Sequence, residues 1–481
     1  MHGVEPGVGH FWPEHTDARP ERLGHHGQGR EPPAVGGAGF HVLVKPAGDA
    51  CNLDCSYCFY KTKHALYPNS RRQMSPEVLD RYLRQLVETG SRRVTLSWQG
   101  GEPTLMGRGF FREAMARVEQ LRRPGQRIEH TLQTNGMLLD DEWCALLKAH
   151  DVLVGISIDG PRPLHDAGRP DHRGRGSFDR VMRGLDRLRA HGVRYNVLTA
   201  VNAANAGHPL EVYRFLRDEA GADYIQFIPV VIRGQGAATG QDEAIDPRSV
   251  RGAAYGRFLC CVFDEWVRHD VGRVGVQTFE SCLEVWSGTP PSVCVNAPVC
   301  GTALALEHNG DLYACDHFVR PEYRRGNILE ADLAALASGE AQRRFGLDKL
   351  SGLPKHCRAC DVLPFCWGGC PKDRFGGSGE EPGVNVLCDG YRMMFRHVAA
   401  PMRIMAWLLR RHRPLADIVQ WLDRLPDWVG AANAIAGRND ACACGSGRRL
   451  KHCCGAMPCA ERGPPGFPAA ASTADLAPPA G

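Results

Sequence analysis

The hydrophobic pattern between residues 39 and 250 alternates between two kinds of segment. Short, mostly apolar runs predict strands at residues 40–44, 93–98, 128–133, 152–158, 195–201 and 224–231. Apolar residues three and four positions apart predict helices at residues 76–88, 139–149, 178–191, 210–219 and 253–269. Strands that alternate with helices form a parallel sheet with right-handed crossovers. Because about eight such units close a full barrel and fewer are predicted here, we expect an α/β fold with an open, partial (β/α)6 barrel.

The segments around this barrel differ in composition and set the expected domain boundaries. Residues 1–38 are rich in Gly, Pro, His and Arg, and residues 456–481 are rich in Pro and Ala. Neither shows a periodic pattern, so both are predicted to be disordered. The expected domains between these tails are a barrel at 39–250, a helical linker at 251–293, a cysteine-rich domain at 294–400, a connector with helical patterns at 402–409 and 418–425 within 401–436, and a small metal-binding module at 437–455.

Composition narrows the class of protein. The net charge of +4 is small for 481 residues and points to no nucleic-acid partner. The chain has no run of the roughly 18 apolar residues that a membrane helix needs, and its N-terminal residues lack the apolar core of a signal peptide. We therefore expect a cytoplasmic protein with no membrane span, and we expect a monomer. In a reducing cytosol the 20 cysteines favour metal binding or catalysis over disulfides.

Three cysteines stand close together in the loop after the first predicted strand. Cys51, Cys55 and Cys58 are followed directly by Phe59 and Tyr60. Three thiolates can hold three irons of a cubane iron–sulfur cluster and leave the fourth iron open for a ligand. A zinc knuckle is the alternative, but zinc sites are closed by four ligands, and no fourth cysteine is near.

A glycine pair follows the predicted strand at residues 93–98. Gly100 and Gly101 allow a ligand to approach the backbone closely, and they are followed by Glu102 and Pro103. The carboxyl ends of parallel strands are where α/β folds bind ligands, so Glu102 would stand at that mouth. An ordinary strand-to-helix turn is the other interpretation.

Two further sets of cysteines lie in the second half of the chain. The first has eight members, enough for two fully ligated clusters or for a pair of zinc sites: Cys294, Cys300, Cys315, Cys357, Cys360, Cys366, Cys370 and Cys388. The second can close one tetrahedral zinc site, with His452 as an alternative ligand: Cys442, Cys444, Cys453 and Cys454. So small a module cannot bury a core, so the metal would fold it.

These motifs resemble those of known families. The cysteine triad followed by Gly-Gly-Glu-Pro resembles the radical S-adenosylmethionine (SAM) enzymes. From Cys294 to Cys388 the spacing resembles the SPASM domain of anaerobic sulfatase-maturating enzymes, including the Cys315-Asp316 pair, and the likeness runs from about residue 40 to about residue 397. Residues 437–455 resemble the SEC-C zinc motif, which that family does not require and which suggests docking to a partner.

The resemblance implies cofactors and ligands. It implies SAM, three 4Fe–4S clusters and, in the tail, zinc. The auxiliary cluster nearer the active site would take Cys294, Cys300, Cys315 and Cys370. The outer one would take Cys357, Cys360, Cys366 and Cys388. The implied SAM contacts are Tyr60, Gly101, Ser157, Arg169 and the backbone of Val231, with Gln99 as a further candidate.

It also implies an activity and partners. A cysteine or serine of a sulfatase polypeptide would be oxidised to Cα-formylglycine. A 5′-deoxyadenosyl radical would take a hydrogen from Cβ, Asp316 would take the side-chain proton, and the auxiliary clusters would take the second electron. A flavodoxin- or ferredoxin-type protein would supply electrons from outside.

Alternatives remain open from the sequence. A SPASM-type maturase that forms a thioether or crosslink in another peptide has the same cysteines, and a metal-bound adaptor would use only the tail. The choice between cysteine and serine as substrate residue is not decided. Five cysteines have no assigned role, and those on the helix at 253–269 are predicted to be small core residues: Cys144, Cys260, Cys261, Cys282 and Cys459.

Overall fold

The computed structural model describes residues 39–422, except 69, 235–244 and 377–382. Several predictions concern residues outside this part of the chain: the two tails, the metal-binding module at 437–455 and the end of the connector. The same holds for the four cysteines of that module, Cys442, Cys444, Cys453 and Cys454, and for Cys459.

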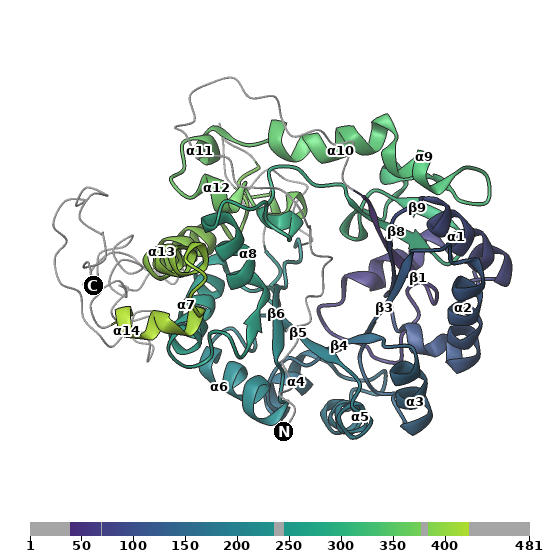
Figure 1. Ribbon diagram of the computed structural model, residues 1–481, viewed down its shortest axis with the longest axis horizontal. Helices are drawn as coiled ribbons and strands as arrows, with labels where there is room; N and C mark the ends of the chain where they lie inside the picture. The colour runs from purple at the N-terminus through teal and green to yellow at the C-terminus, as the bar shows by residue number, and fades with distance from the viewer. Residues whose placement is uncertain (1–38, 69, 235–244, 377–382, 423–481) are drawn as a thin grey trace.

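The six predicted strands are present and form the parallel part of one sheet (Figure 1). They are β1 His41–Lys45, β2 Arg93–Trp98, β3 Arg127–Thr134, β4 Leu153–Ser157, β5 Tyr195–Val201 and β6 Tyr224–Pro229. Each pairs in parallel with the next along the chain. The partial (β/α)6 barrel expected from the hydrophobic pattern is confirmed.

Four short strands extend this sheet to ten, beyond the sequence prediction. They are β7 Gly275–Val276, β8 Ala303–Glu307, β9 Asp311–Tyr313 and β10 Arg324–Asn327. Strand β7 pairs in parallel with β6, and β8 pairs in parallel with β1, so that Lys45 lies opposite Glu307. Strands β9 and β10 continue as an antiparallel meander. The start of the cysteine-rich segment is therefore joined to the barrel as edge strands, not as a separate unit.

Helices line the outer side of the curved sheet (Figure 1). They are α1 Pro76–Glu88, α2 Gly107–Leu121, α3 Asp141–Ala149, α4 Arg162–Gly168, α5 Phe178–Ala190 and α6 Pro209–Arg214, which continues as a π-helical turn, Phe215–Glu219. Local sequence explains their starts: the Ser75 side chain accepts a hydrogen bond from the Val78 amide ahead of Pro76, and Asp140 does the same for Trp143. Helices α2 and α4 were not predicted.

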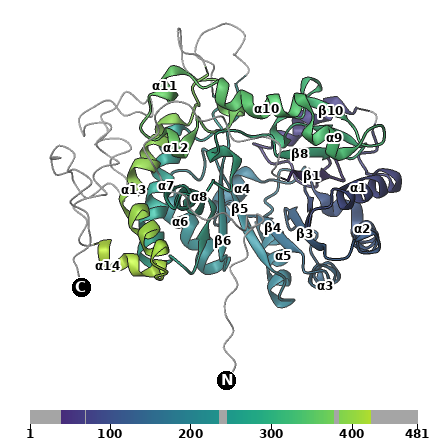
Figure 2. The ribbon, with the colours of Figure 1, turned by 45° about the horizontal axis from the view of Figure 1, so that its top comes forward.

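Three longer helices pack beside β6 at the end of the barrel (Figure 2). They are α7 Gly252–His269, α8 Gln277–Trp286 and α13 Cys388–Arg410. The expected boundary between the cysteine-rich domain and the connector, at 400/401, falls inside α13, which continues through Pro401. The helical pattern at 402–409 is the last part of this helix. The pattern at 418–425 begins a short helical segment, Leu415–Ile418 and α14 Val419–Leu422.

The cysteine-rich segment adds four short helices above the barrel (Figure 2). They are α9 Leu333–Ser338, α10 Glu340–Ser351, α11 Lys355–Arg358 and α12 Leu363–Cys366. One hydrophobic core runs from the barrel strands through Leu304 and Leu306 of β8 to Met394 and Met402 of α13. Barrel and cysteine-rich segment therefore fold around shared apolar contacts. Within the described residues, no helix has the length and apolar character needed to cross a membrane.

Candidate active site

The loop that carries the cysteine triad lies at the carboxyl ends of the barrel strands. It leaves β1 and ends in a 3₁₀ helix, Phe59–Leu66. Its backbone is fixed to the segment after α4, because the Asp54 amide donates to the Pro170 carbonyl at 2.8 Å and the Ser56 amide donates to the Gly168 carbonyl at 2.9 Å. These bonds place the three thiols over the mouth of the sheet, where α/β folds bind ligands.

The three thiols of the triad lie close enough to influence one another. Burial raises the pKa of Cys51 to about 12, and Glu102, Cys55 and Cys58 raise it further. Three thiolates this close repel, so iron ions between them are the natural partner. The Asn135 side chain and the Leu53 amide donate to the Cys51 sulfur, at 3.7 and 3.4 Å, and such bonds tune a cluster. The donor set fits an iron–sulfur cluster held by three cysteines.

Gly101 is needed by the backbone of the cysteine loop itself. A Cβ atom at this position would lie 2.1 Å from the Ala50 carbonyl oxygen. The Gly101 amide donates to the Gly48 carbonyl at 2.9 Å, and the Glu102 amide donates to Ala50 at 2.7 Å. The sequence predicted a ligand at the open side of this glycine; the structure shows a neighbouring loop there.

Glu102 is completely buried and its carboxylate is fully bonded. It accepts hydrogen bonds from the Thr104 amide at 3.0 Å, the Thr134 hydroxyl at 2.8 Å and the Asn135 amide at 2.7 Å. Burial raises its pKa, although these bonds oppose the change. Glu102 thus ties the ends of β2 and β3 together beneath the triad.

Arg169 lies in a buried network beside Cys55. One of its terminal nitrogens donates to the Tyr57 hydroxyl at 3.0 Å and lies 3.8 Å from Asp159, to which Tyr57 also donates. The Nε atom of Arg169 is buried and has no hydrogen-bond partner within the described chain. A guanidinium with an unused donor beside the cluster loop suits a carboxylate ligand.

The other expected SAM contacts lie around the same mouth. Ser157 ends β4, and its hydroxyl accepts a hydrogen bond from Gln133 at 3.1 Å. The Gln99 amide donates to the Val44 carbonyl at 2.7 Å. Val231 lies just beyond β6 and packs against the hydrophobic core. These residues come from several strands that the fold brings together.

Asp316 is buried between the triad loop and the cysteine-rich segment. Tyr60, two residues after the triad, donates its hydroxyl to Asp316 Oδ2 at 2.8 Å. Lys45 contacts Asp316 Oδ1, and the Lys63 ammonium lies 3.2 Å from the same oxygen and 3.1 Å from the Asp316 carbonyl. The Tyr60 side chain, expected at the adenine of SAM, is instead engaged with the carboxylate and with both lysine ammoniums over its ring.

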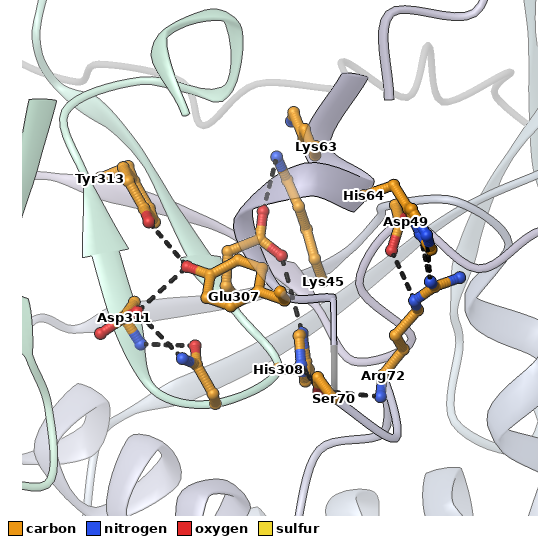
Figure 3. A network of polar contacts seen from close by, with 12 residues as sticks. Lys45, Asp49, Lys63, His64, Ser70, Arg72, Glu307, His308, Asp311 and Tyr313 are labelled. Atoms are coloured by element: carbon orange, nitrogen blue, oxygen red, sulfur yellow. Dashed lines mark hydrogen bonds and ion pairs between the residues drawn. The ribbon is translucent and has the colours of Figure 1, made fainter. Parts of the chain in front are cut away.

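The two lysines at Asp316 are almost inaccessible to solvent. Burial, and the neighbouring ammonium of Lys45, hold the pKa of Lys63 well below its usual range. Burial also lowers the pKa of Lys45, although Glu307 opposes this. Glu307 stands behind Lys45, with Lys45 Nζ 3.7 Å from its Oε1 atom (Figure 3). Two buried cations and two buried carboxylates therefore balance each other around the proposed base.

The eight later cysteines separate into two groups in space. Burial raises the pKa of Cys300 to about 12, with Cys294 and Cys315 adding to the effect. Cys370 is raised by burial and, more weakly, by Cys315 and Cys294. The structure therefore brings together the four cysteines that the resemblance assigned to the inner cluster.

The remaining four form the outer group. Burial raises the pKa of Cys388 to about 12, and Cys366, Cys357 and Cys360 contribute to this shift. The same four thiols line one cavity, with His356 and Arg392 at its wall. The interleaved assignment, in which Cys366 and Cys370 serve different groups, agrees with this placement.

The spacing of these thiols is wider than a single metal ion needs. Within the described residues, no three His, Cys, Asp or Glu side chains converge on one ion-sized site. Thiolates around one zinc ion lie about 4 Å apart, because each Zn–S bond is about 2.3 Å long. The open arrangement suits the larger 4Fe–4S cluster and argues against the pair of zinc sites.

Sequence patterns alone missed several residues of this site. Lys349 is buried and donates to the carbonyls of Cys294, Val295 and Ala297, which fixes the loop around the inner group. Lys45, Lys63, Glu307 and Tyr57 were also missed. A lysine at the end of an apolar strand such as β1 was a usable signal, but its partner is more than 250 residues away.

Cysteines outside these groups are structural. Cys144 in α3 and Cys282 in α8 are buried in the core, as are Cys260 and Cys261 in α7. This agrees with the prediction that the pair on the helix at 253–269 consists of small core residues.

Family models match three parts of the chain. The Radical SAM superfamily matches residues 46–216, an iron–sulfur cluster-binding domain (SPASM) matches residues 294–361, and the SEC-C motif matches residues 438–456. The matched segments contain the triad, the second cysteine set and the tail cysteines, respectively.

Named relatives extend over most of the chain. A serine-type anaerobic sulfatase-maturating enzyme of Bacteroides thetaiotaomicron is 41% identical over 79% of this chain and 95% of its own. A cysteine-type enzyme of Clostridium novyi is 29% identical over 77% of this chain and 99% of its own. A solved structure, native anSMEcpe with bound AdoMet and Cp18Cys peptide, superposes with a TM-score of 0.68 at 28% identity, over 77% and 99% of the two chains. This chain therefore belongs to the anaerobic sulfatase-maturating enzymes, the radical SAM oxidoreductases that carry a SPASM domain.

Proposed function

We propose that this enzyme oxidises a cysteine or serine side chain of a sulfatase polypeptide to Cα-formylglycine. One observation carries the proposal: Asp316 directly follows Cys315 of the inner group and accepts a hydrogen bond from Tyr60, just after the triad. A carboxylate thus stands between the two places where a radical is made and where an electron is accepted. The named relatives act on sulfatases and share this arrangement of motifs.

SAM bound at the triad cluster would supply the hydrogen-abstracting radical, and the auxiliary clusters would accept the second electron. The protein side chains hold the base and bind the cofactor. Lys45 and Lys63 direct two positive charges at Asp316 Oδ1, and Tyr60 fixes Oδ2. A fixed carboxylate within reach of the substrate thiol or hydroxyl can take its proton as carbon is oxidised.

Arg169 is proposed to bind the SAM carboxylate through its unused Nε donor. Gly101, Ser157, Gln99 and the backbone of Val231 remain proposed contacts at the same mouth, in line with the AdoMet-bound structures of the relative. Three 4Fe–4S clusters are proposed at the three cysteine groups. The tail cysteines are proposed to hold zinc, and a flavodoxin- or ferredoxin-type donor to supply electrons.

Serine is proposed as the residue that is converted. The relatives that are 35–41% identical to this chain are serine-type enzymes, whereas the cysteine-type relatives are 28–30% identical. The difference is consistent across several enzymes of each type.

The test uses the anaerobically reconstituted full chain with SAM, a reductant and two peptides that differ only in carrying Ser or Cys before x-Pro-x-Arg. We expect the mass spectrum to show an aldehyde product from the serine peptide. SAM cleavage without aldehyde from either peptide would contradict the proposal and favour a maturase that forms thioethers or crosslinks. No SAM cleavage would favour an inactive adaptor.

A further inference from the structure

A column of buried polar side chains leads from Asp316 to the protein surface. Lys45 contacts Asp316 on one side and faces Glu307 on the other. Behind Glu307 stands His308, and His308 Nε2 contacts the Ser70 hydroxyl (Figure 3). Four elements contribute to it: β1, β8, the turn after β8 and the segment ahead of α1.

The interior of the column is dry and its outer end is wet. Lys45, Glu307 and His308 are 0%, 2% and 3% exposed, respectively. Ser70 is half-buried, accepts a hydrogen bond from the Arg72 amide at 3.0 Å and is followed by the exposed Arg71. The column therefore connects a buried carboxylate to solvent.

Two contacts in the column are longer than hydrogen bonds. Lys45 Nζ lies 3.7 Å from Glu307 Oε1, and His308 Nδ1 lies 3.9 Å from Glu307 Oε2. The facing atoms Glu307 Oε1 and His308 Nδ1 are buried without a hydrogen-bond partner in the described chain. A lysine ammonium on its flexible four-carbon stem can swing across such a gap between two carboxylates.

His308 is held in place on both faces. Gly48 adopts a positive φ of 55°, and a Cβ there would lie 2.9 Å from His308 Nδ1. Tyr67 packs edge-on against the ring with centroids 5.2 Å apart. With both faces packed, the ring keeps Nδ1 toward Glu307 and Nε2 toward Ser70.

The proposed reaction gives this arrangement a task. Each turnover breaks one S–H or O–H bond of the substrate and delivers a proton to a buried carboxylate. That proton has to leave before the next turnover. Tyr60 and the lysines surround Asp316, and the peptide substrate would cover the remaining side, so direct loss to water is hindered.

We propose that Lys45, Glu307, His308 and Ser70 conduct the substrate proton from Asp316 to solvent. The substrate bond leaves its electron pair on sulfur or oxygen, and only the proton travels. Lys45 receives one proton from Asp316 and gives one to Glu307. His308 takes it at Nδ1 and releases another from Nε2 through Ser70 to water. Each side chain returns to its starting charge, and no electron moves along the column.

The inference rests on the proposed function and is tested with the reconstituted full chain. The variants are His308→Ala, His308→Gln, Glu307→Gln and the half-buried Ser70→Ala. Tyr313→Phe is the matched control, because it removes a buried hydroxyl bonded to Tyr67 at 2.7 Å without interrupting the column. Iron content and SAM cleavage without peptide verify that each variant is assembled, since neither needs the substrate proton to leave.

Two single-turnover readouts are followed: aldehyde formation in H₂O and D₂O, and proton release into weakly buffered solution with an indicator dye. We expect the column variants to release the proton at least tenfold later than the wild type, with a larger solvent isotope effect. Imidazoles added to His308→Ala should restore release in the order of their pKa values. The control should match the wild type.

Wild-type timing and isotope effect in assembled His308→Gln and Ser70→Ala would overturn the proton path. So would rescue of His308→Ala that follows the size of the added imidazole and not its pKa. Absence of aldehyde from the wild type would instead reject the proposed function, so the two failures are distinguishable.

Discussion

At the scale of single residues, Asp316 shows how burial and charge define a reactive group. Its carboxylate has a tyrosine hydroxyl on one oxygen and lysine ammoniums on the other. In water such contacts contribute little, but inside a protein each is strengthened by the low local dielectric. The position of the group follows from these contacts and not from its immediate neighbours in the chain.

Asp316→Asn is expected to slow aldehyde formation by about 10²–10⁴-fold, the usual contribution of a general base, because an amide cannot take the substrate proton. SAM cleavage should persist, so the yield of 5′-deoxyadenosine per aldehyde rises. Chromatographic quantification of both products measures this ratio. Asp311→Asn, on the neighbouring strand, is the control, and equal losses in both variants would contradict the assignment.

Gly101→Ala should displace the cysteine loop, because the new Cβ would lie 2.1 Å from a backbone oxygen that cannot move independently. Overpacking of this kind costs about 1–3 kcal/mol of stability. We expect a lower melting temperature and loss of the triad cluster. Gly109→Ala is the matched control, since nothing lies within 4 Å of its new Cβ. A fully loaded, wild-type-like Gly101→Ala protein would refute the packing argument.

At the scale of secondary-structure elements, the pairing of β8 with β1 decides where the catalytic groups meet. The parallel register sets Lys45 opposite Glu307, and the chain then turns through β9 to reach Cys315 and Asp316. A shift of one residue would point Glu307 to the other face of the sheet. The edge strands thus position chemistry as well as closing the sheet.

Helices α7 and α13 pack through glycines at their contact. A Cβ on Gly390 would lie 2.0 Å from the Gly252 carbonyl oxygen, and one on Gly256 would lie 2.6 Å from the Gly390 Cα. Gly390→Ala is therefore expected to destabilise the protein by about 1–3 kcal/mol and to displace Cys388, at the start of α13. Calorimetry on the reconstituted protein, compared with Gly109→Ala, measures the change; equal melting temperatures would show that the helices can separate without cost.

At the scale of the whole molecule, three groups of thiols lie around one continuous core. The triad and the inner group meet at Asp316. The inner and outer groups share the short segment at 357–370, in which Cys366 belongs to one and Cys370 to the other. Electron transfer from the substrate to the outside can therefore proceed through adjacent sites.

Cys366→Ala and Cys51→Ala should lower iron content equally but differ in chemistry. Three cubanes hold about 12 irons per chain, so each variant is expected to retain about 8. Cys366→Ala should still cleave SAM, because the triad is intact, while Cys51→Ala should not. Iron analysis and 5′-deoxyadenosine formation give the two readouts. SAM cleavage by Cys51→Ala would show that the triad is not the SAM site.

The sequence by itself determined the barrel, because six apolar runs alternating with helical spacing have few other ways to bury their apolar surface. It also identified the thiols, whose clustering reports their chemistry directly. Only the tertiary structure decided which residues surround Asp316. Lys45, Tyr60 and Glu307 are local in no useful sense, and short strands β8 and β9 carry too little periodic signal to reveal the pairing that brings these residues together.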